Sequence, residues 1–286
     1  MVKFRRGDGA SEHLEDRRGR GVGLAAGGGL AGIIALVVSL LAGGGGGGGG
    51  GLPDLFDQLQ GGASGTVDPA DEPLVEEMAD ALDDVQAFWA GEAGLGARYE
   101  PATLVLFTDA VQTDGCGTAP SSVGPFYCPA DAHAYLDLSF FRELDSRYGA
   151  PGDFARVYVL AHELGHHVQN LLGDNERVRQ EQAADPGRAN ELSVRLELQA
   201  DCYAGVWGHS AQDRGLIEPG DLEEGLDAAA AVGDDRLQGQ AGGRVSPESW
   251  THGSSEARQQ WFRAGFERGS LDACDTFAAS PAELGL

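Results

Sequence analysis

The segment His162-Glu163-Leu164-Gly165-His166 has the residue types and the spacing of a metal site. On a helix, residues four apart lie on one face, one turn apart, so His162 and His166 can reach the same ion. Two imidazoles in this arrangement can bind one Zn²⁺, and Glu163 then points toward the side where a water molecule would lie. The segment therefore predicts a zinc site at which Glu163 acts as a general base.

The alternative is a helix that carries these histidines by chance. Residues 157–161 are Val, Tyr, Val, Leu and Ala, so the helix is strongly apolar and much of it is expected to be buried. Buried histidines need a charged partner, a hydrogen bond or a metal ion, and one shared ion satisfies both rings at once. We therefore favour metal coordination.

A catalytic zinc site needs a third protein ligand and an open fourth position. Position 172, six residues after His166, holds leucine, which excludes the third histidine of the metzincin pattern. Glu197 and Asp201 lie four residues apart in the next long helical pattern, so they share one face. We expect Glu197 to be the third ligand and Asp201 to accept a hydrogen bond from the outer nitrogen of a ligand histidine. The alternative is two solvated acids on a helix surface.

His252 comes just before the last predicted helix, in the segment Trp250-Thr251-His252-Gly253-Ser254. It is a candidate catalytic residue, because its imidazole could donate a hydrogen bond to the oxyanion that develops during amide hydrolysis. An ordinary helix-capping loop explains the same segment equally well, so both interpretations stay open.

Hydrophobic spacing predicts the elements that must position these residues. The predicted helices cover residues 74–89, 153–172, 190–210, 221–232 and 255–268, and the predicted strands cover residues 103–108 and 134–140. Many helices with few strands are typical of an α+β domain, here mostly helical with a small sheet. The second and third of these helices carry the candidate ligands.

The net charge of the chain, −25, is unevenly distributed. Residues 1–20 carry six basic and four acidic side chains, a net charge of +2, so the remainder carries −25 − 2 = −27. Because such an acidic body repels the phosphate backbone, nucleic acid is not an expected partner.

Four cysteines allow three pairings. Cys116 and Cys128 lie in Gly- and Pro-rich sequence, where a disulfide could close a short loop and stabilise the fold by about 3 kcal/mol. We therefore predict a Cys116–Cys128 disulfide and, by elimination, a Cys202–Cys274 disulfide. Four reduced, buried thiols are the alternative.

Residues 22–42 are apolar and uncharged, and they are long enough to cross a bilayer as one helix. Basic residues precede this stretch and none follows closely, which predicts a cytoplasmic leader at residues 1–21 and a domain outside the cell membrane. Residues 43–70, with the glycine run Gly43 to Gly51, are predicted to form a flexible linker before a domain at residues 71–286. A cleaved signal peptide is the alternative, and it also predicts an exported body.

Several stretches resemble the bacterial membrane-anchored neutral zinc metallopeptidases. They are VGPFYCPAD (123–131), YLDLSFF (135–141), AHELGHHVQNLLG (161–173), ELQADCYAGVW (197–207), GDDRLQG (233–239), THGSS (251–255) and CDTF (274–277). The resemblance implies a zincin-like fold in which His162, His166 and Glu197 bind zinc and Glu163 is catalytic. It implies no particular substrate.

These observations together predict a zinc-dependent endopeptidase that acts on a peptide or protein and is tethered to the cytoplasmic membrane by one helix. Two alternatives remain open. The chain could be a non-catalytic zinc-binding or scaffold protein, although zinc binding alone would not require Glu163. It could also be a zinc amidase that acts on a cell-wall crosslink.

Overall fold

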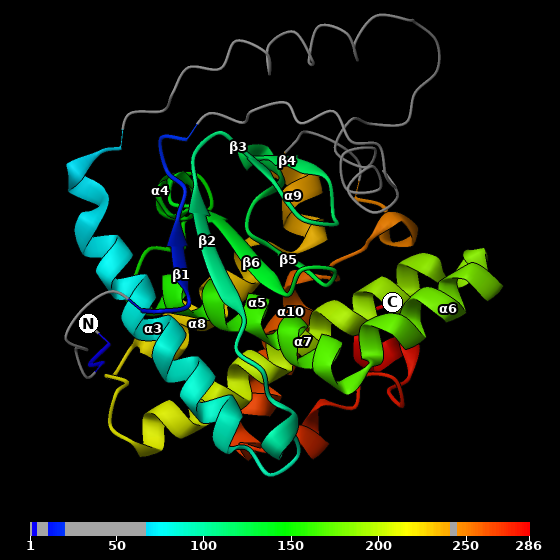
Figure 1. The fold of residues 1–286 in the computed structure, drawn as a ribbon. Coiled ribbons are helices and arrows are strands. Elements are labelled where there is room, and N and C mark those ends of the chain that lie inside the picture. The colour runs from blue at the N-terminus through cyan, green and yellow to red at the C-terminus, as the bar shows by residue number, and fades with distance from the viewer. Residues whose placement is uncertain (1, 5–10, 21–66, 241–244) are drawn as a thin grey trace, which may run out of the picture.

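A small sheet covers one side of a layer of helices in the computed structural model, which describes residues 2–4, 11–20, 67–240 and 245–286 (Figure 1). The sheet has the strand order β1-β2-β6-β5; β1 and β6 are parallel to β2, and β5 is antiparallel to β6. A separate antiparallel pair joins β3 and β4. The strands are β1 (Leu14–Asp16), β2 (Thr103–Phe107), β3 (Ala110–Gln112), β4 (Thr118–Pro120), β5 (Phe126–Cys128) and β6 (His133–Asp137).

The helices agree with the predicted ones to within three residues at either end. They are α3 (Glu72–Gly91), α5 (Asp153–Leu172), α7 (Ala189–Asp213), α8 (Asp221–Ala231) and α10 (Ser255–Arg268), and the helices that we did not predict are α4 (Ser139–Ser146), α6 (Asp174–Ala184) and α9 (Asp234–Gln240). α6 is polar on all sides, so its sequence has no apolar stripe to reveal it. The prediction of a mostly helical α+β domain with a small sheet is confirmed.

The strand predicted at residues 134–140 is too long at its C-terminal end. β6 ends at Asp137, whose carboxylate accepts a hydrogen bond from the Ser139 backbone N–H at 2.9 Å, and Ser139 already begins α4. The Ser139 N–H therefore bonds a side chain instead of a neighbouring strand, and residues 139 and 140 belong to the helix.

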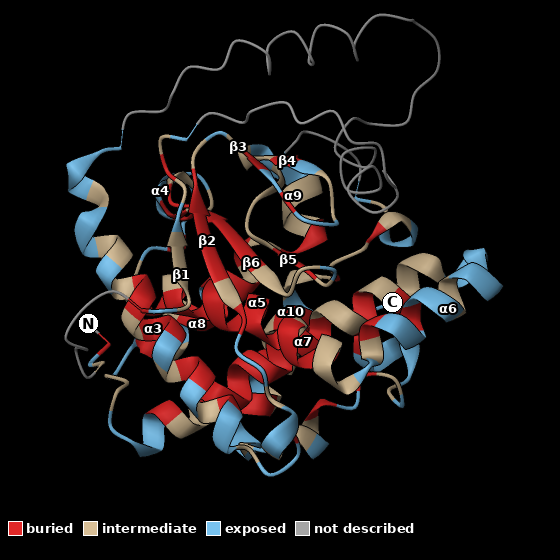
Figure 2. Cartoon of the chain, viewed as in Figure 1, coloured by how far each residue is buried: buried red, intermediate tan, exposed pale blue. Residues whose placement is uncertain are grey.

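Helix α5 lies in the centre of the domain. It contacts β5 and β6 on one side and α7 and α8 on the other, and Figure 2 shows it as one of the most buried segments. A helix covered on both sides needs apolar residues around most of its circumference, which agrees with the buried run Val157 to Ala161. Of the two histidines predicted to bind a metal, His162 is therefore buried and His166 is half-buried.

Helix α7 packs very closely on α10 through two glycines. A Cβ atom at Gly205 would collide with the Phe262 carbonyl group, and one at Gly265 would collide with the Cys202 carbonyl group. Only hydrogen in place of a side chain permits these helices to approach so closely, and this contact brings Arg258 of α10 within reach of Asp201 on α7.

Both predicted disulfides are present. Cys116 and Cys128 are bonded with their Cα atoms 6.0 Å apart, and Cys202 and Cys274 with theirs 5.5 Å apart. The first disulfide ties the segment after β3 to strand β5. The second ties α7 to the chain that follows α10.

The prediction of a transmembrane helix is wrong. In the described part of the chain, no helix has both the length and the apolar character that crossing a bilayer requires. The predicted span at residues 22–42 and most of the predicted linker at 43–70 lie outside the described residues.

We predicted a single-pass membrane protein with its N-terminus in the cytoplasm. The pairing of β1 gives the physical reason to correct this predicted location. Residues Leu14, Glu15 and Asp16 pair with Leu104 to Leu106 in the sheet, although they precede the predicted span. Arg18 also bonds the Glu72 carboxylate at 2.8 Å. A single span would leave its two flanks on opposite sides of a bilayer, whereas here both flanks belong to one folded body.

Candidate metal centre

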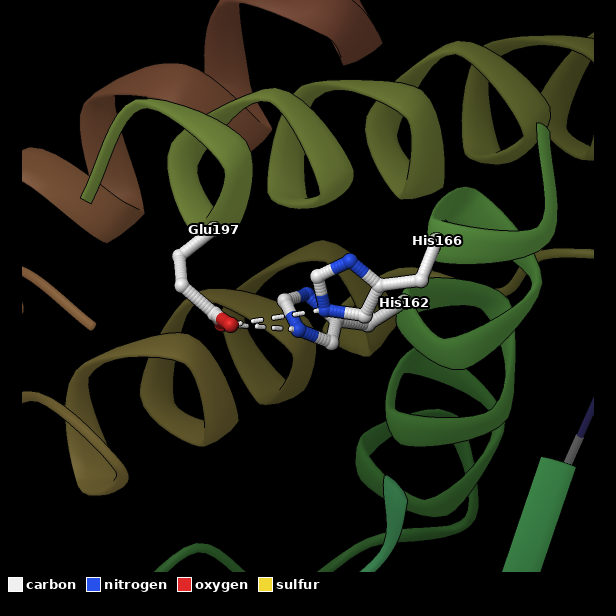
Figure 3. Close-up of side chains that lie close together, drawn as sticks. All are labelled: His162, His166 and Glu197. Carbon is white, nitrogen blue, oxygen red and sulfur yellow. Dashed lines mark ion pairs between the residues drawn. The ribbon is translucent and has the colours of Figure 1, made fainter. Parts of the chain in front are cut away.

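Two histidines from α5 and one glutamate from α7 meet at a single point (Figure 3). Nε2 of His162 lies 3.3 Å from Oε2 of Glu197, and Nε2 of His166 lies 3.5 Å from its Oε1. The ligand atoms all lie within 4.8 Å of one another. Two imidazole nitrogens and one carboxylate oxygen form a typical donor set for zinc, so these residues fit the ion that the sequence predicts.

Gly165 permits the two helices to bring these ligands together. A Cβ atom at this position would lie 2.9 Å from the carbonyl oxygen of Ala200 on α7 and 3.1 Å from its Cα atom. The missing side chain therefore sets the distance between α5 and α7 at the level of the site. This explains a glycine inside a helix, where it costs about 1 kcal/mol relative to alanine.

The outer nitrogen of His162 contacts a buried charged group. Its Nδ1 lies 2.8 Å from Oδ1 of Asp201, which is completely buried, so the contact predicted for Asp201 is present. Arg258 on α10 donates to both Asp201 oxygens at 2.8 and 2.9 Å, and the hydroxyl group of Tyr158 donates to Oδ1 at 2.5 Å. A buried carboxylate with this many donors stays ionised and fixed, and it therefore holds the imidazole of His162 in one orientation.

The pKa values of the three candidate ligands follow from burial and from their neighbours. Burial disfavours the charged ring of His162, but the charge and the hydrogen bond of Asp201 outweigh it and raise the pKa of His162 to about 9. Burial lowers the pKa of His166. Burial alone would raise the pKa of Glu197, but the charge of His166 and the hydrogen bond to His162 hold it well below its usual range. Glu197 is therefore an anion, as a zinc ligand must be.

Glu163 has a carboxyl oxygen with no hydrogen-bond partner in the described part of the chain. This atom, Oε2, is buried. Burial raises the pKa of Glu163 to about 7. A buried carboxyl oxygen without a partner is costly, so Glu163 is a candidate to contact a group bound at the site.

His252 is fixed by Asp234, at the start of α9. Nδ1 of His252 lies 3.1 Å from Oδ1 of Asp234, and Oδ2 of Asp234 accepts from the backbone N–H groups of Thr251, His252 and Gly253 at 2.7–3.0 Å. Burial acts against the charged ring, but the hydrogen bond and charge of Asp234, together with the charge of Glu197, raise the pKa of His252. The charge of His252 acts to lower the pKa of both Glu163 and Glu197.

His167, the neighbour of a candidate ligand, is not part of the site. Its Nδ1 lies 2.9 Å from the hydroxyl oxygen of Tyr127 and its Nε2 lies 2.6 Å from the carbonyl oxygen of Glu100. Both ring nitrogens are therefore used in packing against the segments around β2 and β5.

The sequence analysis did not predict four residues around the centre: Tyr158, Gln169, Asp234 and Arg258. Tyr158 precedes His162 by four residues and Gln169 follows His166 by three, so helical spacing could have indicated both. The other two lie far from the ligands in sequence, and only the packing of α9 and α10 brings them near. The four residues provide or support the outer contacts of all three histidines.

The chain is similar to known proteins along most of its length. Residues 3–277 match the family described as "Putative neutral zinc metallopeptidase". The protein YpfJ of Escherichia coli, described as uncharacterized, is 44% identical over 279 residues, which are 94% of this chain and 97% of that protein. An uncharacterized protein of Mycobacterium tuberculosis is 50% identical over 198 residues, which are 65% of each chain. No solved structure matches significantly. With a match that extends over nearly the whole chain, this protein belongs to the neutral zinc metallopeptidase family.

Proposed function

We propose that the protein is a zinc-dependent peptidase that hydrolyses peptide bonds within a peptide or protein substrate. His162, His166 and Glu197 would hold the ion. When bound, Zn²⁺ would polarise the scissile carbonyl group and lower the pKa of a water molecule toward ~7. The observation that carries the proposal is the buried, unpartnered oxygen of Glu163 beside this donor set.

The protein's own groups would then move the protons. Glu163 would take a proton from the attacking water and pass it to the leaving amine. A pKa of about 7 suits both tasks, because the group can accept and release a proton near neutral pH. His252, held by Asp234, would donate a hydrogen bond to the oxyanion that develops from the carbonyl group.

The substrate backbone would bind along strand β5. In the strand order β1-β2-β6-β5, β5 forms one edge of the sheet, so its outward backbone groups are available to pair with an extended peptide. β6 is flanked by β2 and β5 and has no free edge. β5 contacts α5, so a peptide on this edge would pass close to the metal ligands.

The test is the Glu163→Gln variant of the full chain, compared with wild type for zinc content and for casein cleavage. We expect zinc to be retained and cleavage to fall by about 10²–10⁴-fold, because the amide cannot accept the proton. Glu143→Gln, at an exposed glutamate on α4, is the matched control and should cleave as wild type does.

Other outcomes separate the alternatives. Cleavage by Glu163→Gln at the wild-type rate would exclude the proposed base. A zinc-loaded wild type that leaves casein intact but releases amines from cell-wall fragments would indicate an amidase, and one that acts on neither would indicate a binding protein.

A further inference from the structure

The two histidine ligands have different outer partners. His162 contacts the carboxylate of Asp201, whereas Nδ1 of His166 lies 2.8 Å from Oε1 of Gln169, a neutral amide. The Gln169 side chain is completely buried. Because an amide can in principle present either its oxygen or its nitrogen to a ring, the direction of Gln169 decides which nitrogen of His166 carries the proton.

Two acceptors fix the direction of the Gln169 amide. Its Nε2 lies 2.7 Å from the carbonyl oxygen of Leu196 and 3.0 Å from Oε1 of Gln199. A backbone carbonyl can only accept a hydrogen bond, so the nitrogen of Gln169 must face it. The oxygen of Gln169 must then face His166.

The direction of Gln199 is fixed in the same way. Its Nε2 lies 3.2 Å from the carbonyl oxygen of Cys274, again an acceptor only. Its oxygen therefore accepts from Gln169, which adds a second constraint on that amide. Cys274, whose carbonyl group accepts this hydrogen bond, is tied to α7 by the Cys202–Cys274 disulfide. Leu196 and Gln199 both lie on α7.

We infer that Gln169 is a positioning residue for His166, and that the carbonyl groups of Leu196 and Cys274 set the tautomer of this ring through it. With an acceptor opposite Nδ1, the proton stays on Nδ1, and Nε2 keeps its lone pair available for a metal ion. The inference concerns the ring itself and rests on the proposed function only in that Nε2 then binds zinc.

The two amides and two carbonyl groups that orient His166 carry no net charge, and this has an electrostatic consequence. Glu197 and Asp201 already place two carboxylates around the site, with Arg258 as the buried cation nearby. A carboxylate opposite His166 would add a further buried negative charge, with the desolvation cost that this carries. The amide orients the ring without that charge.

The test is the tautomer of His166 in the full chain after zinc has been removed with a chelator. Two-bond proton–nitrogen NMR spectra distinguish the tautomers, and the signal of His166 is identified by its loss in His166→Asn. We expect the proton on Nδ1 in wild type and a large population with the proton on Nε2 in Gln169→Leu. Zinc affinity, measured by competition with a coloured chelator, should fall by about 10–100-fold in this variant.

Gln86→Leu is the matched control, because Gln86 is also buried and accepts the Ala102 N–H at 2.7 Å, but it lies on α3. It should lose stability and keep both the tautomer and the zinc affinity. If Gln169→Leu does not fold, Gln199→Leu replaces it, and the tautomer with the proton on Nε2 should then appear beside the native one.

A wild-type ring with the proton on Nε2 overturns the inference without any variant. So does a Gln169→Leu protein that keeps the native tautomer and a zinc affinity within twofold of wild type. Neither readout requires hydrolysis, so a chain without peptidase activity would refute the proposed function and leave this inference in place.

Discussion

Gly165 on α5 lies against the backbone of Ala200 on α7, where a Cβ atom would be only 2.9 Å from the carbonyl oxygen. The contact lies between His162 and His166 on one helix and near Glu197 on the other. The separation of the two helices, and with it the size of the metal site, therefore depends on a single missing methyl group.

Gly165→Ala should weaken zinc binding and lower stability, although alanine is the better helix former by about 1 kcal/mol. The added methyl group pushes against backbone, which cannot rotate away, and overpacking of this kind costs about 1–3 kcal/mol. Urea unfolding and chelator competition measure the two effects. Gly91→Ala, at the end of α3 where a Cβ atom would meet nothing within 4 Å, is the control and should not weaken zinc binding. Unchanged zinc affinity in Gly165→Ala would contradict the argument.

Asp201→Asn should be severely destabilising and should also reduce zinc affinity. Arg258 would keep its charge inside the protein without its partner, and breaking a buried ion pair in this way costs about 3–5 kcal/mol. The weaker acceptor for His162 should reduce zinc affinity by about 10–100-fold. Thermal unfolding with and without zinc measures both. Glu143→Gln, which breaks the exposed pair with Arg147, should change little. A stable Asp201→Asn protein would exclude the role assigned to Arg258.

The pair formed by Asp234 and His252 predicts a stability difference that depends on pH. The pKa of His252 is raised from 6.5, so its contribution is complete below pH 6.5 and is lost as the pH rises through the folded-state value. The pKa of Asp234 is lowered from 3.8, so its contribution is present above pH 3.8 and is lost as the pH falls through its folded-state value. The loss of stability in Asp234→Asn should therefore be largest between about pH 4 and 6.5. Urea unfolding across pH 3–9 checks this, and a difference that does not vary with pH would refute it.

Removal of the first 20 residues should destabilise the domain. β2 would lose its parallel partner β1 and would become an exposed edge with an apolar sequence, and Glu72 would lose Arg18. A chain that starts at residue 11 keeps β1 and serves as the control. Thermal unfolding and light scattering should show a lower melting temperature and more aggregation for the chain that starts at residue 21 than for the chain that starts at residue 11. Equal melting temperatures for the two chains would show that β1 contributes nothing.

Local spacing was sufficient to predict the long helices and the histidine pair. His162 and His166 share a face because of the helical repeat alone, and α5 begins and ends at the predicted residues 153 and 172. The short elements were different. β1 has only three residues, two half-buried and one exposed, and nothing in its sequence distinguishes it from a polar leader. Its identity as a strand depends on β2, some 90 residues away in sequence.

The membrane prediction was wrong because it assumed that residues 1–21 lie on one side of a span at 22–42 and take no part in the domain on the other side. A charge-free apolar stretch after basic residues is typical of an anchor, and sequence alone carries no sign that the residues before it return to the domain. The hydrogen bonds from β1 to β2 and from Arg18 to Glu72 are contacts between distant residues, and only the folded chain reveals them.

By itself, the sequence determined the chemistry available at this site: the residue types, their helical spacing and the two acids on a second helix. The tertiary structure decided which groups meet. The approach of α7 to α5 over Gly165, the position of Arg258 under Asp201 and the direction of the Gln169 amide all depend on contacts between segments far apart in the chain. Such contacts form only when the entropy of closing long loops is offset by burial in the common core, which no local pattern encodes.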